Sequence, residues 1–128
     1  MWRYLNKNPK ARDVNDCVIR SISAAEGRSW GDVYDELSKL AREQGIILDD
    51  ARFVEPYLDS KYKRTCYKDK GNAMTVGHFL YSHPVGTYLV TMRGHITCIK
   101  NGILYDTWDC RDKIIWCAWE VKKDYLNG

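Results

Sequence analysis

The Asn101-Gly102 dipeptide constrains the fold of this chain more than any other feature of its sequence. It lies between two segments, residues 94–100 and 103–108, that are rich in Ile, Thr and Tyr. Asn-Gly between such segments is the strongest short-range signal for a β-hairpin with a two-residue turn. Because the length of the turn fixes which residues pair, it also predicts which side chains share a face of the sheet.

The register set by this turn places a histidine beside a carboxylate. Lys100 pairs with Ile103 and, further along, His95 faces Trp108. Residues that face each other project to the same side, as do their neighbours two positions away. His95 and Asp106 therefore lie diagonal to each other on one face, and we expect them to be within reach of a hydrogen bond.

The candidate nucleophile is Cys17, at the start of a predicted helix. Asn15 and Asp16 before it are good cap residues, and Val18 and Ile22 follow at helical spacing. A helix N-terminus stabilises a thiolate through its unpaired N–H groups and its dipole. The remaining cysteines are predicted in strands, in a basic loop or just past a strand end, and lack this setting: Cys66, Cys98, Cys110 and Cys117.

A catalytic thiol needs a base, and the chain has 3 histidines. Only His95 acquires an acidic partner from the predicted register, whereas His78 and His83 acquire none. We therefore expect His95 to take the proton of Cys17 and Asp106 to orient the imidazole. Taken singly, each of these residues could be structural, so the prediction depends on the three together.

The rest of the sequence favours a single α+β domain over residues 1–128. Helices are expected at 17–26, at 29–44, at about 50–58 and from about 75 to before 84, and residues 61–71 are expected to form a charged loop. Strand formers dominate residues 87–121, from which we expect about four antiparallel strands. The helix with Cys17 would pack across this sheet.

A Cys at a helix start, a His on a strand and an Asp on the next strand resemble the papain-like cysteine peptidase superfamily. Residues 13–23 are similar to the nucleophile segment of OTU-type deubiquitinases, and Asp16-Cys17 to that of bacteriocin-leader-processing peptidases. A broader similarity, to small uncharacterised phage and gut-bacterial proteins, is carried by residues 15–20, 30–37, 83–88, 94–95 and 105–109. The resemblance implies a papain-like fold and thiol-dependent hydrolysis.

The chain departs from the superfamily pattern at the oxyanion hole. The glutamine that supplies a donor in papain-like enzymes is replaced by Ala11 or Arg12, so Asn15 is the nearest amide and could act with the Cys17 N–H. Asp16, Gly94 and Trp108 are expected next to the site. We expect Trp108 in the core; in the alternative interpretation it shields the bond between His95 and Asp106 from water.

Composition narrows the cellular setting and the partners. An odd number of cysteines, 5 in all, with no regular spacing predicts reduced thiols in a cytoplasm, and no segment resembles a secretion signal or a membrane span. No Cys or His spacing is typical of a metal site, so neither a metal nor a cofactor is expected. With a net charge of +3, we expect no nucleic acid partner. The basic residues 61–70 are interpreted as a solvated loop, with guidance of an acidic substrate segment as the functional alternative.

The predicted function is hydrolysis of an amide or isopeptide bond in a protein or peptide by Cys17, His95 and Asp106. Two other functions stay open. The same triad could serve an amidase, a deamidase or an acyltransferase, because it determines acyl chemistry but not the acceptor. Alternatively, the chain could be a non-catalytic protein-binding module, such as a phage-encoded inhibitor, in which these residues are structural.

Overall fold

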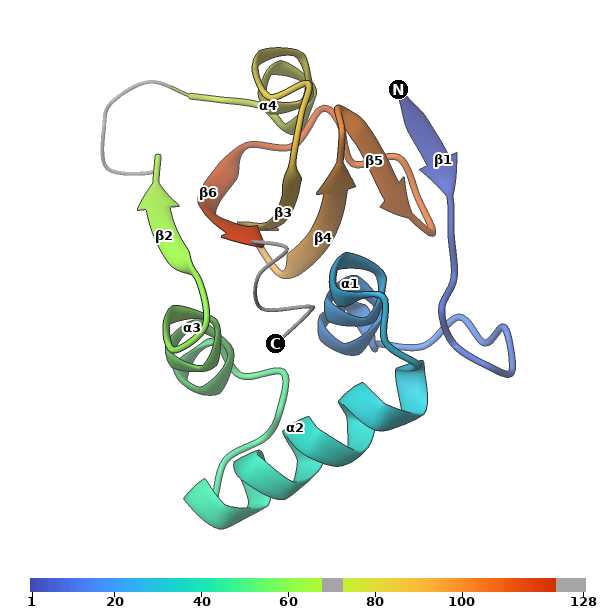
Figure 1. Ribbon diagram of the computed structural model, residues 1–128, viewed down its shortest axis with the longest axis vertical. Helices are drawn as coiled ribbons and strands as arrows, with labels where there is room; N and C mark the ends of the chain where they lie inside the picture. Colours follow the sequence, from blue (N-terminus) through green and yellow to red (C-terminus); the bar gives the residue numbers. More distant parts are fainter. Residues whose placement is uncertain (68–72, 122–128) are drawn as a thin grey trace.

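The computed structural model describes residues 1–67 and 73–121, which form a mixed β-sheet with helices packed on it (Figure 1). The four helices of these residues are α1 (Cys17–Glu26), α2 (Trp30–Gln44), α3 (Ala51–Asp59) and α4 (Val76–Ser82). Their six strands are β1 (Trp2–Tyr4), β2 (Lys63–Cys66), β3 (Thr87–Met92), β4 (His95–Lys100), β5 (Ile103–Asp106) and β6 (Ile115–Val121). The α+β class is confirmed, and the helices lie close to their expected ranges.

Local signals set the ends of the first two helices. α1 begins at Cys17 and ends before Gly27, whose φ of 65° is a conformation that glycine adopts without strain. At the start of α2 the Ser29 hydroxyl accepts a hydrogen bond of 3.1 Å from the Asp32 N–H. Gly45, with a φ of 69°, ends α2. α1 begins where the sequence predicted, with Cys17 as its first residue.

The predicted hairpin register is confirmed. Lys100 pairs with Ile103, and the neighbouring pairs of β4 and β5 follow in the same register. Asn101 and Gly102 have φ angles of 49° and 73°, as a type I′ turn requires. One expectation is wrong, because β5 ends at Asp106 and does not continue to residue 108.

The sheet is larger than expected, and it is not purely antiparallel. Its order is β1-β5-β4-β3-β6-β2, with β1 parallel to β5 and β2 antiparallel to β6. The described residues thus contain six strands where about four were expected. The two unexpected strands are short edge strands, and β2 lies in the segment expected to be a charged loop. Residues 68–72 of that segment lie outside the described residues.

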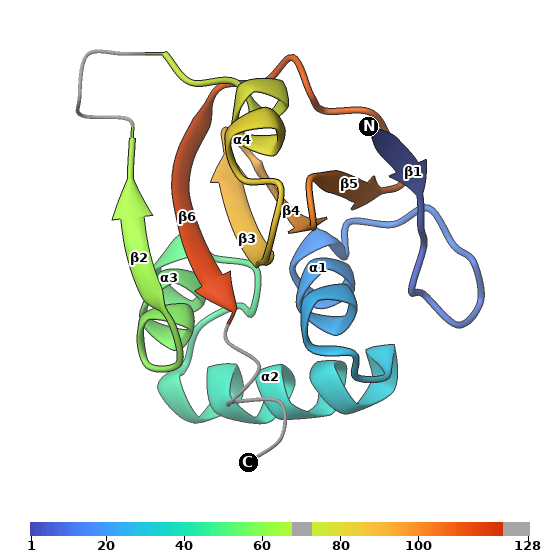
Figure 2. The same ribbon diagram turned by 45° about the horizontal axis from the view of Figure 1, so that its top comes forward.

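The two faces of the sheet carry separate cores. In Figure 2, α4 lies near the top of the view, and α1, α2 and α3 lie below it. On one face, apolar side chains of α1, α2 and α3 pack against alternate residues of the strands, including Leu89 and Trp119. On the other face, α4 packs against the intervening residues, including Val90 and Ala118. This alternation along a strand separates the two cores. No helix in the described ranges is long and apolar enough to cross a membrane.

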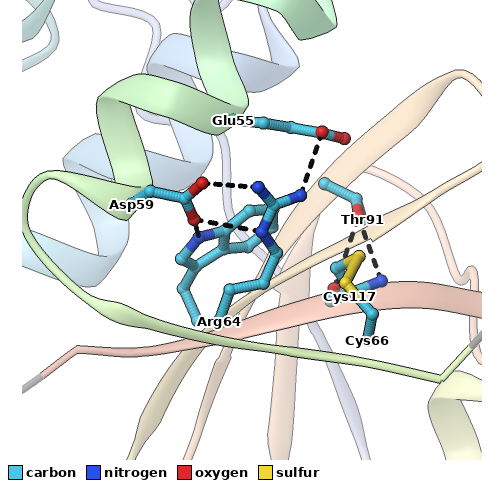
Figure 3. The surroundings of a disulfide bond; sticks show 7 residues. Glu55, Asp59, Arg64, Cys66, Thr91 and Cys117 are labelled. Carbon is cyan, nitrogen blue, oxygen red and sulfur yellow. Dashed lines mark hydrogen bonds and ion pairs between the residues drawn. A yellow bond between two sulfur atoms is a disulfide. The ribbon is translucent and has the colours of Figure 1, made fainter.

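A disulfide between Cys66 and Cys117 contradicts the expectation that all the thiols are reduced. These residues are direct partners in the register of β2 and β6, and their Cα atoms are 4.1 Å apart. Figure 3 shows the bond beside Thr91, whose hydroxyl lies 3.3 Å from both the N and the O of Cys117. Three cysteines remain free, of which only Cys17 is not fully buried.

Candidate active site

Cys17 is the free thiol best placed for chemistry. Burial raises the pKa of Cys17, but hydrogen bonds with the His95 side chain and the Ile96 backbone lower it overall below 9.0. The positive charges of His95 and Arg20 lower this pKa further. In contrast, burial raises the pKa of Cys98 to about 12. Among the free thiols, only that of Cys17 combines partial exposure with a stabilised thiolate.

His95 lies between the thiol and the carboxylate. It opens β4 directly after Gly94, which has a φ of 70° and completes the turn from β3. The Nε2 atom of His95 lies 2.6 Å from Oδ2 of Asp106, which leaves Nδ1 as the ring nitrogen available to the Cys17 thiol. Burial lowers the pKa of His95, but its bonds to Asp106, Cys110 and Cys17 raise it well above 6.5. This favours an imidazolium beside a thiolate.

Asp106 occupies the diagonal position that the register predicted. It is the last residue of β5 and only 4% exposed. Burial raises its pKa, but the hydrogen bond and the charge of His95 lower it overall below 3.8. The neighbouring acid Asp109 is exposed and forms an ion pair of 2.8 Å with Arg111. Strand geometry therefore selects Asp106 over Asp109 as the partner of His95.

Arg20 links the two carboxylates of the site, and the sequence analysis missed this role. Its Nε donates to Asp16 over 2.7 Å, and its Nη1 lies 3.4 Å from Asp106 and 2.9 Å from the Thr107 hydroxyl. The side chain of Arg20 is only 12% exposed. The spacing of Asp16 and Arg20, four positions apart on a helix, could have indicated the first contact. The second contact requires the tertiary fold.

Asp16 holds the segment before Cys17 but does not cap α1. It occupies the N-cap position without a side-chain cap hydrogen bond. Its carboxylate instead accepts from Arg20, from Asn8 at 3.2 Å and from the Trp30 indole at 3.0 Å. The expected cap contact is therefore wrong, because these three donors hold the carboxylate away from the helix end. Among the described residues, no side chain accepts a hydrogen bond from the N–H groups of the first turn of α1.

Asn15 lies on the same cavity as Cys17 and His95. Its side chain is exposed, and it makes no hydrogen bond with any residue in the described ranges. An amide in this position is free to donate to a substrate oxygen. The role of Asn15 as an oxyanion donor stays a prediction.

Two side chains complete the surroundings of His95. Trp108 is 40% exposed, so its expected place in the core is wrong; its ring centroid lies 5.0 Å from that of His95. Because β5 ends at Asp106, Trp108 is free to lie over the imidazole. Cys110, which the sequence analysis set aside, is fully buried, with its Sγ 3.9 Å from Oδ2 of Asp106. No local pattern indicated this contact.

His95, Asp106 and Cys110 are also the group of side chains that could hold a metal ion within the described residues. Each offers one ligand atom, and these atoms lie within 4.8 Å of one another. Cys, His and Asp all bind zinc. An ion bound here would replace the hydrogen bond between His95 and Asp106, because both would use the same atoms.

The other histidines lie elsewhere. His83 stacks on Phe79 with the ring centroids 3.9 Å apart, and His78 is exposed on α4. Neither forms an ion pair with a carboxylate in the part of the chain that the structure describes.

Comparison of the chain with models of protein families, with curated proteins and with solved structures gave no match.

Proposed function

We propose that this protein is a cysteine hydrolase that cleaves an amide or isopeptide bond in a protein or peptide. The observation that carries the proposal is that His95 lines the same cavity as Cys17 and is held by Asp106 at 2.6 Å. The pKa of Cys17 is lowered and that of His95 is raised, as an ion pair of thiolate and imidazolium requires. Such a pair is the reactive form of a thiol nucleophile.

In the proposed reaction the Cys17 thiolate attacks the carbonyl carbon, and the carbonyl oxygen becomes an oxyanion. In this proposal the Cys17 N–H and the Asn15 amide donate to that oxygen. As the tetrahedral intermediate collapses, the C–N bond breaks and His95 gives its proton to the leaving amine. Water, deprotonated by His95, then attacks the thioester, which releases the carboxylic acid and restores the thiol.

The arrangement of the elements supports a papain-like enzyme, as the resemblance of the sequence suggested. The helix with the nucleophile, α1, packs on β4, the strand with the base, and β5 beside it supplies the acid. Acyl transfer and deamidation remain alternatives because the triad leaves the acceptor open. A cytoplasmic location stays a prediction.

Incubation with a diverse peptide library, followed by mass spectrometry of the products, tests this proposal. We expect new peptide ends with the parent protein and none with Cys17→Ala. A peptidyl epoxide should modify Cys17 in the folded protein, and His95→Ala should slow the modification. Loss of ammonia without chain cleavage would instead indicate a deamidase. If Cys17 of the folded protein reacts with no electrophile, the protein is a binding module and the proposal is wrong.

A further inference from the structure

A cavity of about 200 Å³ opens beside the Cys17 thiol, and the proposed reaction gives no role to its apolar lining. Cys17 and His95 form one side of it. The apolar part of its lining comes from four elements, namely α1, α3, the β3-β4 hairpin and β6. These apolar residues are Val18, Ala51, Val54, Met92, Ile96 and Trp116. A side chain seated in this cavity would lie directly next to the reacting group.

A β-bulge brings Trp116 to this cavity. Thr91 pairs with Cys117, but the next residue of β3, Met92, pairs with Ile115. Trp116 is therefore the extra residue on β6, and bulges of this kind redirect a side chain. The adjoining disulfide between Cys66 and Cys117 holds this part of β6 to β2. The bulge and the disulfide therefore fix the position of Trp116 in the apolar lining.

The charged residues of the lining are acidic. Asp49 and Glu55 both line the cavity, and apart from the catalytic His95 none of the lining residues can carry a positive charge. Glu55 is held by Arg64 over 3.0 Å, as Figure 3 shows. Asp49 is exposed and forms no ion pair within residues 1–67 and 73–121. Asp49 is therefore the carboxylate available to a ligand.

We propose that the cavity seats a bulky apolar side chain of the substrate and that Asp49 attracts a Lys or Arg adjacent to it. The assignment of the cavity to a substrate rests on the proposed function. Its volume exceeds the roughly 150 Å³ of an apolar cavity that binds benzene, so a Leu, Met or Phe side chain fits. The substrate class is thus a peptide segment that is apolar and basic.

This charge preference is the opposite of the one expected from the basic segment 61–70. Two of its cations are held by acids of the protein itself. Lys61 lies 2.5 Å from Glu26, and Arg64 pairs with Asp59 as well as with Glu55. These side chains are therefore not free to guide an acidic segment of the substrate.

Binding of capped dipeptide amides to the Cys17→Ala protein tests the cavity without requiring any reaction. The readout is the NMR shift of the Met92 methyl group, which lies in the lining. We expect Ac-Leu-Lys-NH2 or Ac-Lys-Leu-NH2 to bind at least about tenfold more tightly than the Gly-Lys analogue. At low salt, Lys should be preferred to Glu by about threefold, and this preference should fade at high salt.

Two variants separate the charge from the cavity. Asp49→Asn should remove the preference for Lys over Glu, whereas Asp35→Asn, the same change at an exposed position of α2, should keep it. Ala51→Phe fills the cavity from the exposed first residue of α3 and should abolish the preference for Leu over Gly. Circular dichroism of each variant checks that it is folded.

The outcomes for the cavity and for the proposed function are independent. If the Met92 methyl group does not shift, or shifts equally with Leu-Lys and Gly-Lys, the cavity does not select an apolar side chain and the inference is wrong. If Asp49→Asn leaves the preference for Lys intact, Asp49 does not attract the basic group. Neither result depends on whether Cys17 reacts, because the binding protein lacks the thiol.

Discussion

The first residue of α1 is Cys17 and the last is Glu26, and both side chains lie among charged partners. Glu26 accepts hydrogen bonds from Arg28 at 3.0 Å, from Lys61 at 2.5 Å and from the Tyr62 hydroxyl. Burial raises the pKa of Glu26, but these bonds lower it overall below 4.5. Each end of α1 thus carries an ionisable group whose charged form is stabilised.

The two ends differ in what surrounds the charge. Both oxygens of Glu26 are occupied by donors of the protein, which tie α1 to α2 and to the segment after α3. Cys17, in contrast, lines a cavity of about 200 Å³. A shifted pKa alone therefore does not identify a functional site, because ion pairs that stabilise the fold produce it too. The cavity beside the Cys17 thiol is the distinguishing feature.

The largest expected effect is at the Cys17 end. Cys17→Ala should lower turnover by about 10⁴-fold or more, because the nucleophile is removed. The melting temperature should fall by no more than about 4 °C, since a small side chain at a helix start leaves little empty volume. Peptide hydrolysis and differential scanning calorimetry measure the two quantities. Cys98→Ala, at a fully buried thiol, is the matched control and should keep turnover while losing stability.

The opposite pattern is expected at the Glu26 end. Glu26→Ala should cost about 3 kcal/mol of the free energy of unfolding, because it leaves buried donors without an acceptor. Glu26→Gln should recover part of this loss, and Glu43→Ala, at an exposed position of α2, should have little effect. Urea denaturation measures the free energies. If Glu26→Ala is as stable as the parent, Glu26 does not stabilise the fold, and the proposed contrast between the two ends of α1 is wrong.

The contribution of the Glu26 carboxylate to the free energy of unfolding should depend on pH. Because the pKa of Glu26 is lowered on folding, its contribution to stability is present above about pH 4.5 and is lost as the pH falls through its folded value. The difference in stability between the parent and Glu26→Gln should therefore shrink as the pH falls through that value. A difference that grows on acidification would contradict this assignment.

Asp106→Asn should lower kcat/KM by about a hundredfold while the protein stays folded. The amide can still hold the imidazole, but it stabilises the imidazolium less well than a carboxylate does. Asp109→Asn, three positions further along the chain, is the control. Its kcat/KM should stay within about threefold of the parent value, because Asp109 pairs with Arg111 at the surface. If Asp109→Asn has the larger effect, the assigned triad is wrong.

The smallest expected effect is a shift in the reactivity of Cys17 with pH. The thiolate is the reactive form, so the rate of alkylation by iodoacetamide rises as the pH rises through the Cys17 pKa, which lies below 9.0. His95→Ala removes a hydrogen bond and a charge that lower this pKa, so the midpoint should move up by about one pH unit. Glu26→Gln should leave the midpoint unchanged. Mass spectrometry of the Cys17 adduct gives the rates.

Much of the candidate site follows from sequence because its determinants are local. The Asn101-Gly102 turn fixes the pairing of β4 with β5, and this register alone brings His95 to Asp106. The start of α1 at Cys17 was also predicted, from the helical spacing of Val18 and Ile22, although the cap contact expected of Asp16 does not form. In both cases few conformations of a short segment satisfy its backbone hydrogen bonds and bury its apolar residues.

Other features were decided by the tertiary structure, because their partners are far apart in sequence. β1 has only 3 residues and a weak pattern, and it becomes a strand by pairing with β5. The disulfide joins cysteines separated by 51 positions, which only the alignment of β2 and β6 brings together. The contact of Arg20 with Asp106 similarly requires α1 to pack on the sheet. Sequence by itself determined the hairpin and the position of the thiol, where short-range geometry leaves few choices; long-range packing decided the sheet edges, the disulfide and the cavity.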